Sequence, residues 1–155
     1  MRGKRAKIRK IQKDARYKSA LFTRFINSIM LHGKKNLAEK IFYEVIEGGA
    51  EELKTDPVEF VNKVVDNIRP ALEIKSRRVG GSNYQVPVPV SPLRQETLAI
   101  RWLLEISRKK SGASFADLLK GQMIAAYKGE GDVLKKKQDV EKMAEANKAF
   151  AHFRW

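Results

Sequence analysis

The side chains best suited to chemistry are two adjacent arginines, Arg77 and Arg78, in the stretch SRRVGGSNYQVPVPV. Neighbouring residues of a β-strand point to opposite sides, so the two guanidinium groups could bind two phosphates, or a phosphate and a base edge, around one narrow finger. Gly80 and Gly81 favour a tight turn because glycine accepts positive φ angles. The stretch therefore indicates a finger that binds a polyanion. The alternative is a hairpin packed on its own protein with two solvated arginines.

Other cations extend this pattern into a hypothetical basic strip. Lys34 and Lys35 follow Gly33 between two helical segments, and Arg94 and Arg101 are two helical turns apart, so they share a helix face. Lys75 could continue the strip through the base of the finger. The predicted RNA-binding residues are Arg2, Lys4, Arg5, Lys7, Arg9, Lys10, Lys34, Lys35, Lys75, Arg77, Arg78, Arg94, Arg101, Arg108, Lys109, Lys110 and Lys136.

Aromatic residues could add base stacking to this surface. Tyr84 could equally pack on the protein or stack on a base. The tail AFAHFRW over residues 149–155 interleaves aromatic and basic groups, as RNA-contacting segments do, or it folds back over the core. Lys135, Lys136 and Lys137 could meet RNA or form an ordinary charged helix face.

Catalytic and metal chemistry find no support in the residues. The chain has no cysteine, and its two histidines, His32 and His152, lie far apart without ligand spacing. Gly129 to Gly131 is followed by Asp132 and not by the lysine and hydroxyl residue of a phosphate loop. We therefore expect no enzyme activity, no metal and no cofactor.

The charge balance points to nucleic acid. The 155 residues, enough for one domain, carry a net charge of +14, and a field of this sign attracts polyanions. Residues 1–35 hold 12 basic and 1 acidic side chains, whereas residues 36–74 hold 4 and 9. Such uneven charge favours one binding face opposite a face for water or protein partners. The rivals are a DNA-binding protein and a membrane-surface protein; no apolar run is long enough to span a bilayer.

Hydrophobic periodicity predicts the elements that must position these groups. A basic arm over residues 1–18, expected to be flexible alone and to become ordered on a polyanion, precedes a first helix between Ser19 and Gly33. A second helix is expected to break at Gly48 and Gly49, with the following EEL as a ragged continuation. A third begins with Asp56 as its cap and proline in its first turn, and it ends at Pro70.

The second half of the chain predicts a hairpin over residues 72–90 and three more helices. The strands alternate up to Val79 and again from Tyr84, with a four-residue connection. Helices follow from Pro92, from Ser114 and from Asp132, and the last has so few apolar residues that we expect it outside with a face free for a partner. The predicted fold is mostly α, one domain over residues 1–155: a bundle of about six helices with one protruding β-hairpin between the third and fourth helices.

Four stretches resemble one known family. These are RFINSIMLHGKKNLAEKIFY from Arg24, RRVGGSNYQVPVPVSP from Arg77, LAIRWLLEISR from Leu98 and KKKQDVEKMAEANKAFAHFRW from Lys135. In the same order and over essentially the whole chain, they are similar to the bacterial form of small-subunit ribosomal protein number seven. DARYKS, residues 14–19, departs from the family, which often has an acidic residue and proline before the tyrosine.

The resemblance implies a structural ribosomal protein of the cytoplasm, without catalysis. Members bind the 3′ major domain of small-subunit ribosomal RNA and nucleate assembly of the subunit head beside neighbouring head proteins. Their hairpin lies near the exit site, where it contacts transfer RNA and messenger RNA. Carried onto this chain, the hairpin tip that would face these RNAs comprises Val79, Gly80, Gly81, Ser82, Asn83 and Tyr84.

Overall fold

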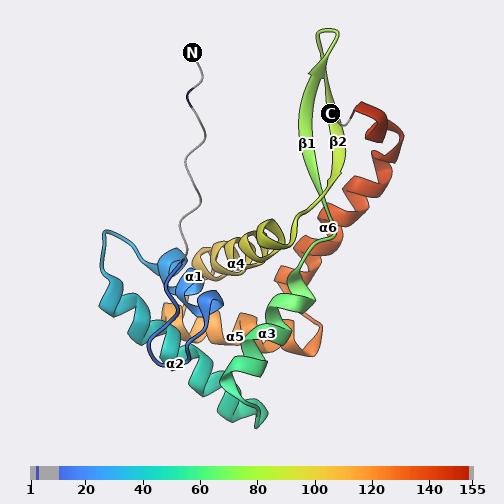
Figure 1. Ribbon diagram of the computed structural model, residues 1–155. Coiled ribbons are helices and arrows are strands. Elements are labelled where there is room, and N and C mark those ends of the chain that lie inside the picture. Colours follow the sequence, from blue (N-terminus) through green and yellow to red (C-terminus); the bar gives the residue numbers. More distant parts are fainter. Residues whose placement is uncertain (1–2, 4–10, 154–155) are drawn as a thin grey trace.

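The computed structural model describes residue 3 and residues 11–153, and it confirms the predicted mostly helical fold with one hairpin (Figure 1). The predicted arm residues Arg2, Lys4, Arg5, Lys7, Arg9 and Lys10 lie outside the described residues. In chain order the elements are α1 (Ala20–Ile29), α2 (Lys35–Leu53), α3 (Pro57–Ile68), β1 (Leu72–Val79), β2 (Ser82–Pro89), α4 (Pro92–Lys109), α5 (Phe115–Lys128), α6 (Asp132–Ala146) and the 3-10 helix η1 (Lys148–Phe153).

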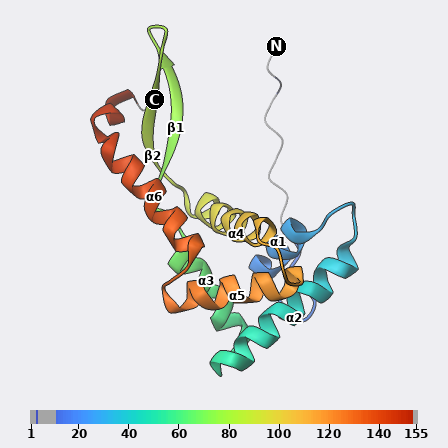
Figure 2. The same cartoon turned by 180° about the vertical axis from the view of Figure 1, so that it is seen from behind.

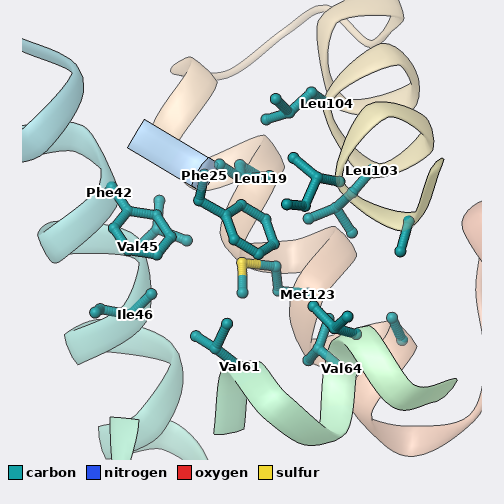
Figure 3. Close-up of a cluster of buried hydrophobic side chains, with 14 of the residues drawn as sticks. Phe25, Phe42, Val45, Ile46, Val61, Val64, Leu103, Leu104, Leu119 and Met123 are labelled. Atoms are coloured by element: carbon teal, nitrogen blue, oxygen red, sulfur yellow. The ribbon is translucent and has the colours of Figure 1, made fainter. Parts of the chain in front are cut away.

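The core lies between helices α1 to α5 and is centred on phenylalanine rings. Phe25 of α1 lies close to Leu103 of α4 and to Leu119 and Met123 of α5 (Figure 3), and its ring stacks on Phe42 of α2 with centroids 5.4 Å apart. All five side chains are essentially inaccessible to water. Burying each such side chain contributes about 1.5–3 kcal/mol, so this cluster holds the helices that carry the charged surface.

Two helices begin with a side-chain cap, α3 at Asp56 as predicted and α5 at Ser114. The Asp56 carboxylate accepts hydrogen bonds from the backbone N–H groups of Val58 and Glu59, at 2.9 and 3.3 Å. The Ser114 hydroxyl accepts one from the N–H of Asp117 at 3.1 Å. These bonds satisfy N–H groups that the first helical turn leaves without a partner.

The predicted break in the second helix was wrong, since α2 runs without interruption through Gly48 and Gly49. The reason is packing. A Cβ atom at Gly49 would lie 2.8 Å from Cε1 of the buried Phe60 ring, so glycine is needed for the close approach of α3 and not as a helix terminator. Sequence alone does not separate these two uses of glycine.

The hairpin has a shorter connection than predicted. Val79 pairs with Ser82, so the turn consists of Gly80 and Gly81 alone, both with positive φ, at 57° and 92°. Such a turn matches the twist of the strands it joins. The pair forms a sheet of only two strands, which rises away from the bundle (Figures 1 and 2).

Helix α6 lies on the outside, as its sparse apolar residues predict. It runs beside the hairpin and contacts β1 (Figure 1), where Val133 and Ala144 are buried, while Met143 remains exposed. The short helix η1 then lies against β2. There the Tyr84 ring packs on Phe150 and Phe153, with centroids 5.3 and 5.0 Å apart. The described part of the tail thus packs on the hairpin and not on the bundle core.

Candidate nucleic-acid interface

Helix α4 carries the centre of the predicted basic strip. Arg94, Arg101 and Arg108 recur every seven residues along it and are all exposed. The helix is presented at a fixed angle because its opposite side is buried, with Leu103 fully inaccessible. Its single helical face therefore offers a row of guanidinium groups at intervals of two turns.

The beginning of α4 is tied to the base of the hairpin by one carboxylate. Glu73 of β1 accepts from the Arg94 guanidinium at 3.3 Å and pairs with the Lys75 ammonium at 3.1 Å. Glu73 and Lys75 lie two residues apart and so on the same strand face. The structure thus brings together Lys75 and Arg94, two residues predicted to continue the strip from helix to hairpin.

The end of α4 is tied to the end of α1. Arg108 donates hydrogen bonds to the carbonyl oxygens of Ser28 and Ile29, at 3.3 and 3.1 Å. A cation in this place also interacts favourably with the partial negative charge of the α1 C-terminus. Between the two helices lies a cavity of about 560 Å³. It is lined by Ser28, Thr97, Arg101, Leu104, Glu105, Arg108 and Lys109.

The lysines at this end share their charge with acids. Glu105 pairs with Lys109 at 2.8 Å and with Lys136 of α6 at 2.7 Å. Hydrogen bonds from these two lysines, that from Lys109 first, lower the pKa of Glu105 to about 2. Lys110 pairs with Asp132 at 2.7 Å. Lys109, Lys110 and Lys136 are therefore next to the strip but partly neutralised within the protein.

Two more lysines occupy the start of α2. Lys34 is the N-cap residue and Lys35 the first helical residue, and both are exposed. A lysine cannot accept the hydrogen bonds of a capping side chain, and α2 has no acidic residue in its first turn. Cations at a helix N-terminus are electrostatically unfavourable in isolation, so their presence at this position favours binding of an anion.

The hairpin arginines lie on opposite sides, as alternation predicts. Arg78 is exposed, whereas Arg77 is half-buried and pairs with Tyr84 across the hairpin, so these two side chains lie on the same face. Val79 and the turn glycines lie beyond both, with Ser82 and Asn83 exposed at the start of β2. The tip is therefore accessible at residues 78–83, while Tyr84 packs on η1.

Acidic residues that organise the surface were missed by the sequence reasoning. Glu96 of α4 pairs with Arg24 of α1 and, at 3.1 Å, with Arg69, the C-cap residue of α3. This carboxylate connects three helices under the strip. Its place, two residues after Arg94 on α4, could be read from helical geometry, but its partners are 72 and 27 residues away and carry no local signal.

The end of the predicted arm is anchored by Asp14, which is buried. Its carboxylate accepts from the Tyr43 hydroxyl at 2.6 Å and from the N–H of Tyr17 at 2.9 Å. Burial, with the hydrogen bond to Asp14, raises the pKa of Tyr43 well above its usual value. The chain therefore approaches α1 along a defined path over α2.

Residue 3 and residues 11–153 contain no cluster of histidine, aspartate and glutamate suited to a metal ion. No helix in that part of the chain combines the length and apolar character needed to cross a bilayer.

Comparison with known proteins decides the family. Residues 1–148 match the family model described as ribosomal protein S7p/S5e. The chain belongs to the ribosomal protein S7p/S5e family. It is similar to the small ribosomal subunit protein uS7 of Thermosipho africanus, at 45% identity over the full length of both chains. It is also similar to the uS7 proteins of Magnetococcus marinus and Vibrio vulnificus, at 47% and 49% identity over 95% of this chain and 94% of each relative.

Membership of the S7p/S5e family confirms the resemblance read from the sequence. The family consists of structural ribosomal proteins and not of enzymes. The chain is thus a ribosomal protein of the small subunit.

Proposed function

We propose that this protein binds the 3′ major domain of small-subunit ribosomal RNA, nucleates assembly of the subunit head, and contacts transfer RNA and messenger RNA near the exit site through its hairpin. The observation that carries the proposal is the row of exposed arginines on α4, continuous with Lys75 at the hairpin base. A rigid cationic face of this kind suits the phosphate backbone of folded RNA. The relatives named above are small-subunit ribosomal proteins.

Binding and reach belong to different parts of the molecule in this proposal. The α4 face binds ribosomal RNA, because phosphate contacts fix the position of a protein without reading sequence. The hairpin tip, residues 78–83, lies far from the bundle (Figure 2) and reaches toward transfer RNA and messenger RNA. The acidic block of residues 36–74 is left for neighbouring head proteins, since charge complementarity favours basic partners there.

A nuclease footprint on full-length small-subunit ribosomal RNA tests the binding site. We expect protection confined to the 3′ major domain, and an affinity that falls steeply between about 50 and 200 mM salt as counterions are released. The double variant Arg94→Gln/Arg101→Gln should bind less tightly with a shallower salt dependence. Protection in another domain, or equal displacement of the RNA by duplex DNA, would contradict the proposal.

Shortening the hairpin tests the second role. Replacing residues 78–83 by Asn-Gly removes whole facing pairs and keeps Tyr84 in its register with Arg77. The shortened protein should bind the 3′ domain nearly as well as the full chain but support weaker exit-site binding of transfer RNA in reconstituted subunits. Total loss of ribosomal RNA binding would instead make the tip an anchor.

A further inference from the structure

An apolar groove opens at the end of the bundle where α1 meets α2. It has a volume of about 390 Å³, and its lining comes from the α1–α2 loop and from the starts of α2 and α5. It is lined by Ile29, Met30, Leu31, His32, Lys34, Leu37, Ala38, Ile41, Arg108 and Phe115. Leu31 and Leu37 are 57% and 52% exposed, which is unusual for large aliphatic side chains in a protein with a well-packed core.

The charge around the groove is of one sign. Lys34 and Arg108 carry positive charge, and no acidic residue contributes to the lining. A second groove of about 490 Å³, between the hairpin base and α6, has an equally apolar lining but includes Glu141 and Glu145. The α1–α2 groove therefore suits a ligand that is apolar and flat in one part and anionic in another, whereas the α6 groove does not.

The walls are also held in place before any ligand arrives. The Lys34 N–H donates to the Leu31 carbonyl at 3.0 Å, and the Lys35 N–H donates to that of Gly33 at 2.8 Å. His32 and Gly33 both have left-handed φ angles, 52° and 72°, so the loop makes a compact turn. A preformed pocket avoids the entropic cost of ordering its walls on binding.

We propose that this groove takes one unpaired nucleobase of the ribosomal RNA, with the adjoining phosphate next to Lys34. The inference rests on the proposed function. Two planar groups in the lining suit a base: the Phe115 ring and the Arg108 guanidinium, whose Cζ lies 5.9 Å from that ring's centroid. Unpaired bases of RNA are commonly stacked on aromatic and guanidinium planes. The volume lies at the lower end of the range for small-ligand pockets, about 300–1,000 Å³, and so fits one base.

Position favours RNA over an acidic peptide, which would satisfy the same charges. Arg108 lines both this groove and the cavity on α4 that contains Arg101. An RNA strand bound along the α4 arginines therefore passes the mouth of the groove, with no gap of acidic surface between the two cavities apart from Glu105. A nucleotide splayed out of that strand reaches the groove directly.

The test separates an apolar contribution from a charged one. The double variant Leu31→Ser/Leu37→Ser removes the two exposed walls and keeps every charge. With a transcript of the 3′ major domain, we expect affinity about tenfold weaker, in line with the loss of one stacked base, and an unchanged slope of log K against log salt. Lys34→Gln should instead reduce that slope by about 0.7–0.9, the value of one phosphate contact.

Chemical probing of the same complexes gives an independent readout. The wild-type protein should protect one unpaired nucleotide that the double variant leaves reactive, with other protections retained. Met143→Ser is the matched control, because Met143 is an equally exposed apolar side chain, 51% accessible, on α6. It should change neither affinity nor protection.

Three outcomes distinguish the inference from its basis. Wild-type affinity and an unchanged footprint in the double variant would overturn the nucleobase assignment while leaving ribosomal RNA binding intact. If that variant instead lost the incorporation of another head protein, the groove would belong to a protein partner, which also overturns the assignment. Failure of the wild-type protein to bind the transcript would overturn the proposed function itself.

Discussion

The helical bundle and the projecting part of this protein, which consists of the hairpin, α6 and η1, are held together in different ways. In the bundle, five helices surround side chains such as Phe25, Phe42 and Met123 that are almost completely buried (Figure 3). In the projecting part, the contacts among the two strands, α6 and η1 bury side chains less completely, and Tyr84 and Phe153 remain partly accessible. The difference shows how a small protein can combine a stable bundle with a long projection. Apolar burial is concentrated where the helices cross, and the projecting part extends outward with less of it.

The largest effect on stability is expected from a cavity in the core of the bundle. Phe42→Ala removes a ring that contacts Phe22 and Phe25, with centroids 5.2 and 5.4 Å apart, and leaves a cavity. We expect the free energy of unfolding in urea to fall by about 3–5 kcal/mol. Leu37→Ala on the exposed side of the same helix is the control, with a change under about 1 kcal/mol. A similar loss in both variants would contradict the localised core.

A smaller effect is expected from filling the helix contact. Gly49→Ala places a methyl group against the Phe60 ring, and such overpacking costs about 1–3 kcal/mol. That cost exceeds the roughly 1 kcal/mol that alanine gains over glycine in a helix. Gly121→Ala in α5, where no atom lies within 4 Å of the added Cβ, should instead stabilise the protein. Differential scanning calorimetry of both variants gives the two signs.

A substitution in the projecting part should have a local effect. Tyr84→Ala removes the ring between Phe150 and Phe153, and aromatic pairs contribute about 0.5–1.5 kcal/mol beyond their buried area. We expect trypsin to cleave after Lys148 several times faster, with the urea midpoint of the bundle nearly unchanged. Tyr84→Phe keeps the ring and should behave as wild type. Loss of bundle stability in Tyr84→Ala would mean that the projecting part and the bundle unfold as one unit.

The smallest effect concerns the contact between the two regions, where Lys136 of α6 meets Glu105 of α4. The pKa of Glu105 is lowered from an ordinary 4.5 to about 2. Its ion pairs therefore stabilise the protein above about pH 4.5, and this contribution is lost as the pH falls toward 2. Because Glu105 is partly exposed, and solvent screens its ion pairs, Glu105→Gln should cost less than about 1 kcal/mol at pH 7.

That gap between the wild type and Glu105→Gln should close as the pH is lowered from 5 to 2. Carboxyl NMR titration of the wild type and of Lys136→Met provides a direct check. The pKa of Glu105 should rise in the variant, which lacks one of the two hydrogen-bonding lysines. An unchanged pKa would mean that Lys109 alone accounts for the shift.

Local signals explain why the helices could be predicted and some of their contacts could not. Asp56 and Ser114 cap helices through neighbours two or three residues away, so the sequence itself contains both partners. The role of Gly49 could not be read locally, because glycine is needed there for contact with Phe60, a residue on another helix. The contact of α6 with β1 could not be read for the same reason, because the two elements are far apart in the sequence.

The candidate site divides along the same line. The seven-residue spacing of the α4 arginines is local and was readable. The α1–α2 groove was not, because Leu37 is part of an apolar stripe in the sequence, and only the packing of α1, α2 and α5 shows that the stripe extends past the core into solvent. Similarly, no pattern announces that Arg108 binds the last carbonyl groups of α1.

The carboxylate of Glu96 sets two arginines of this molecule apart from the row on α4. Arg24 and Arg69 are retained by it between three helices, and a passing polynucleotide would have to break those ion pairs to recruit them. The formal charge of +14 is therefore no direct guide to the number of ions released on RNA binding. A partly buried carboxylate in a strongly basic protein thus keeps structural cations in their ion pairs when the protein binds a polyanion.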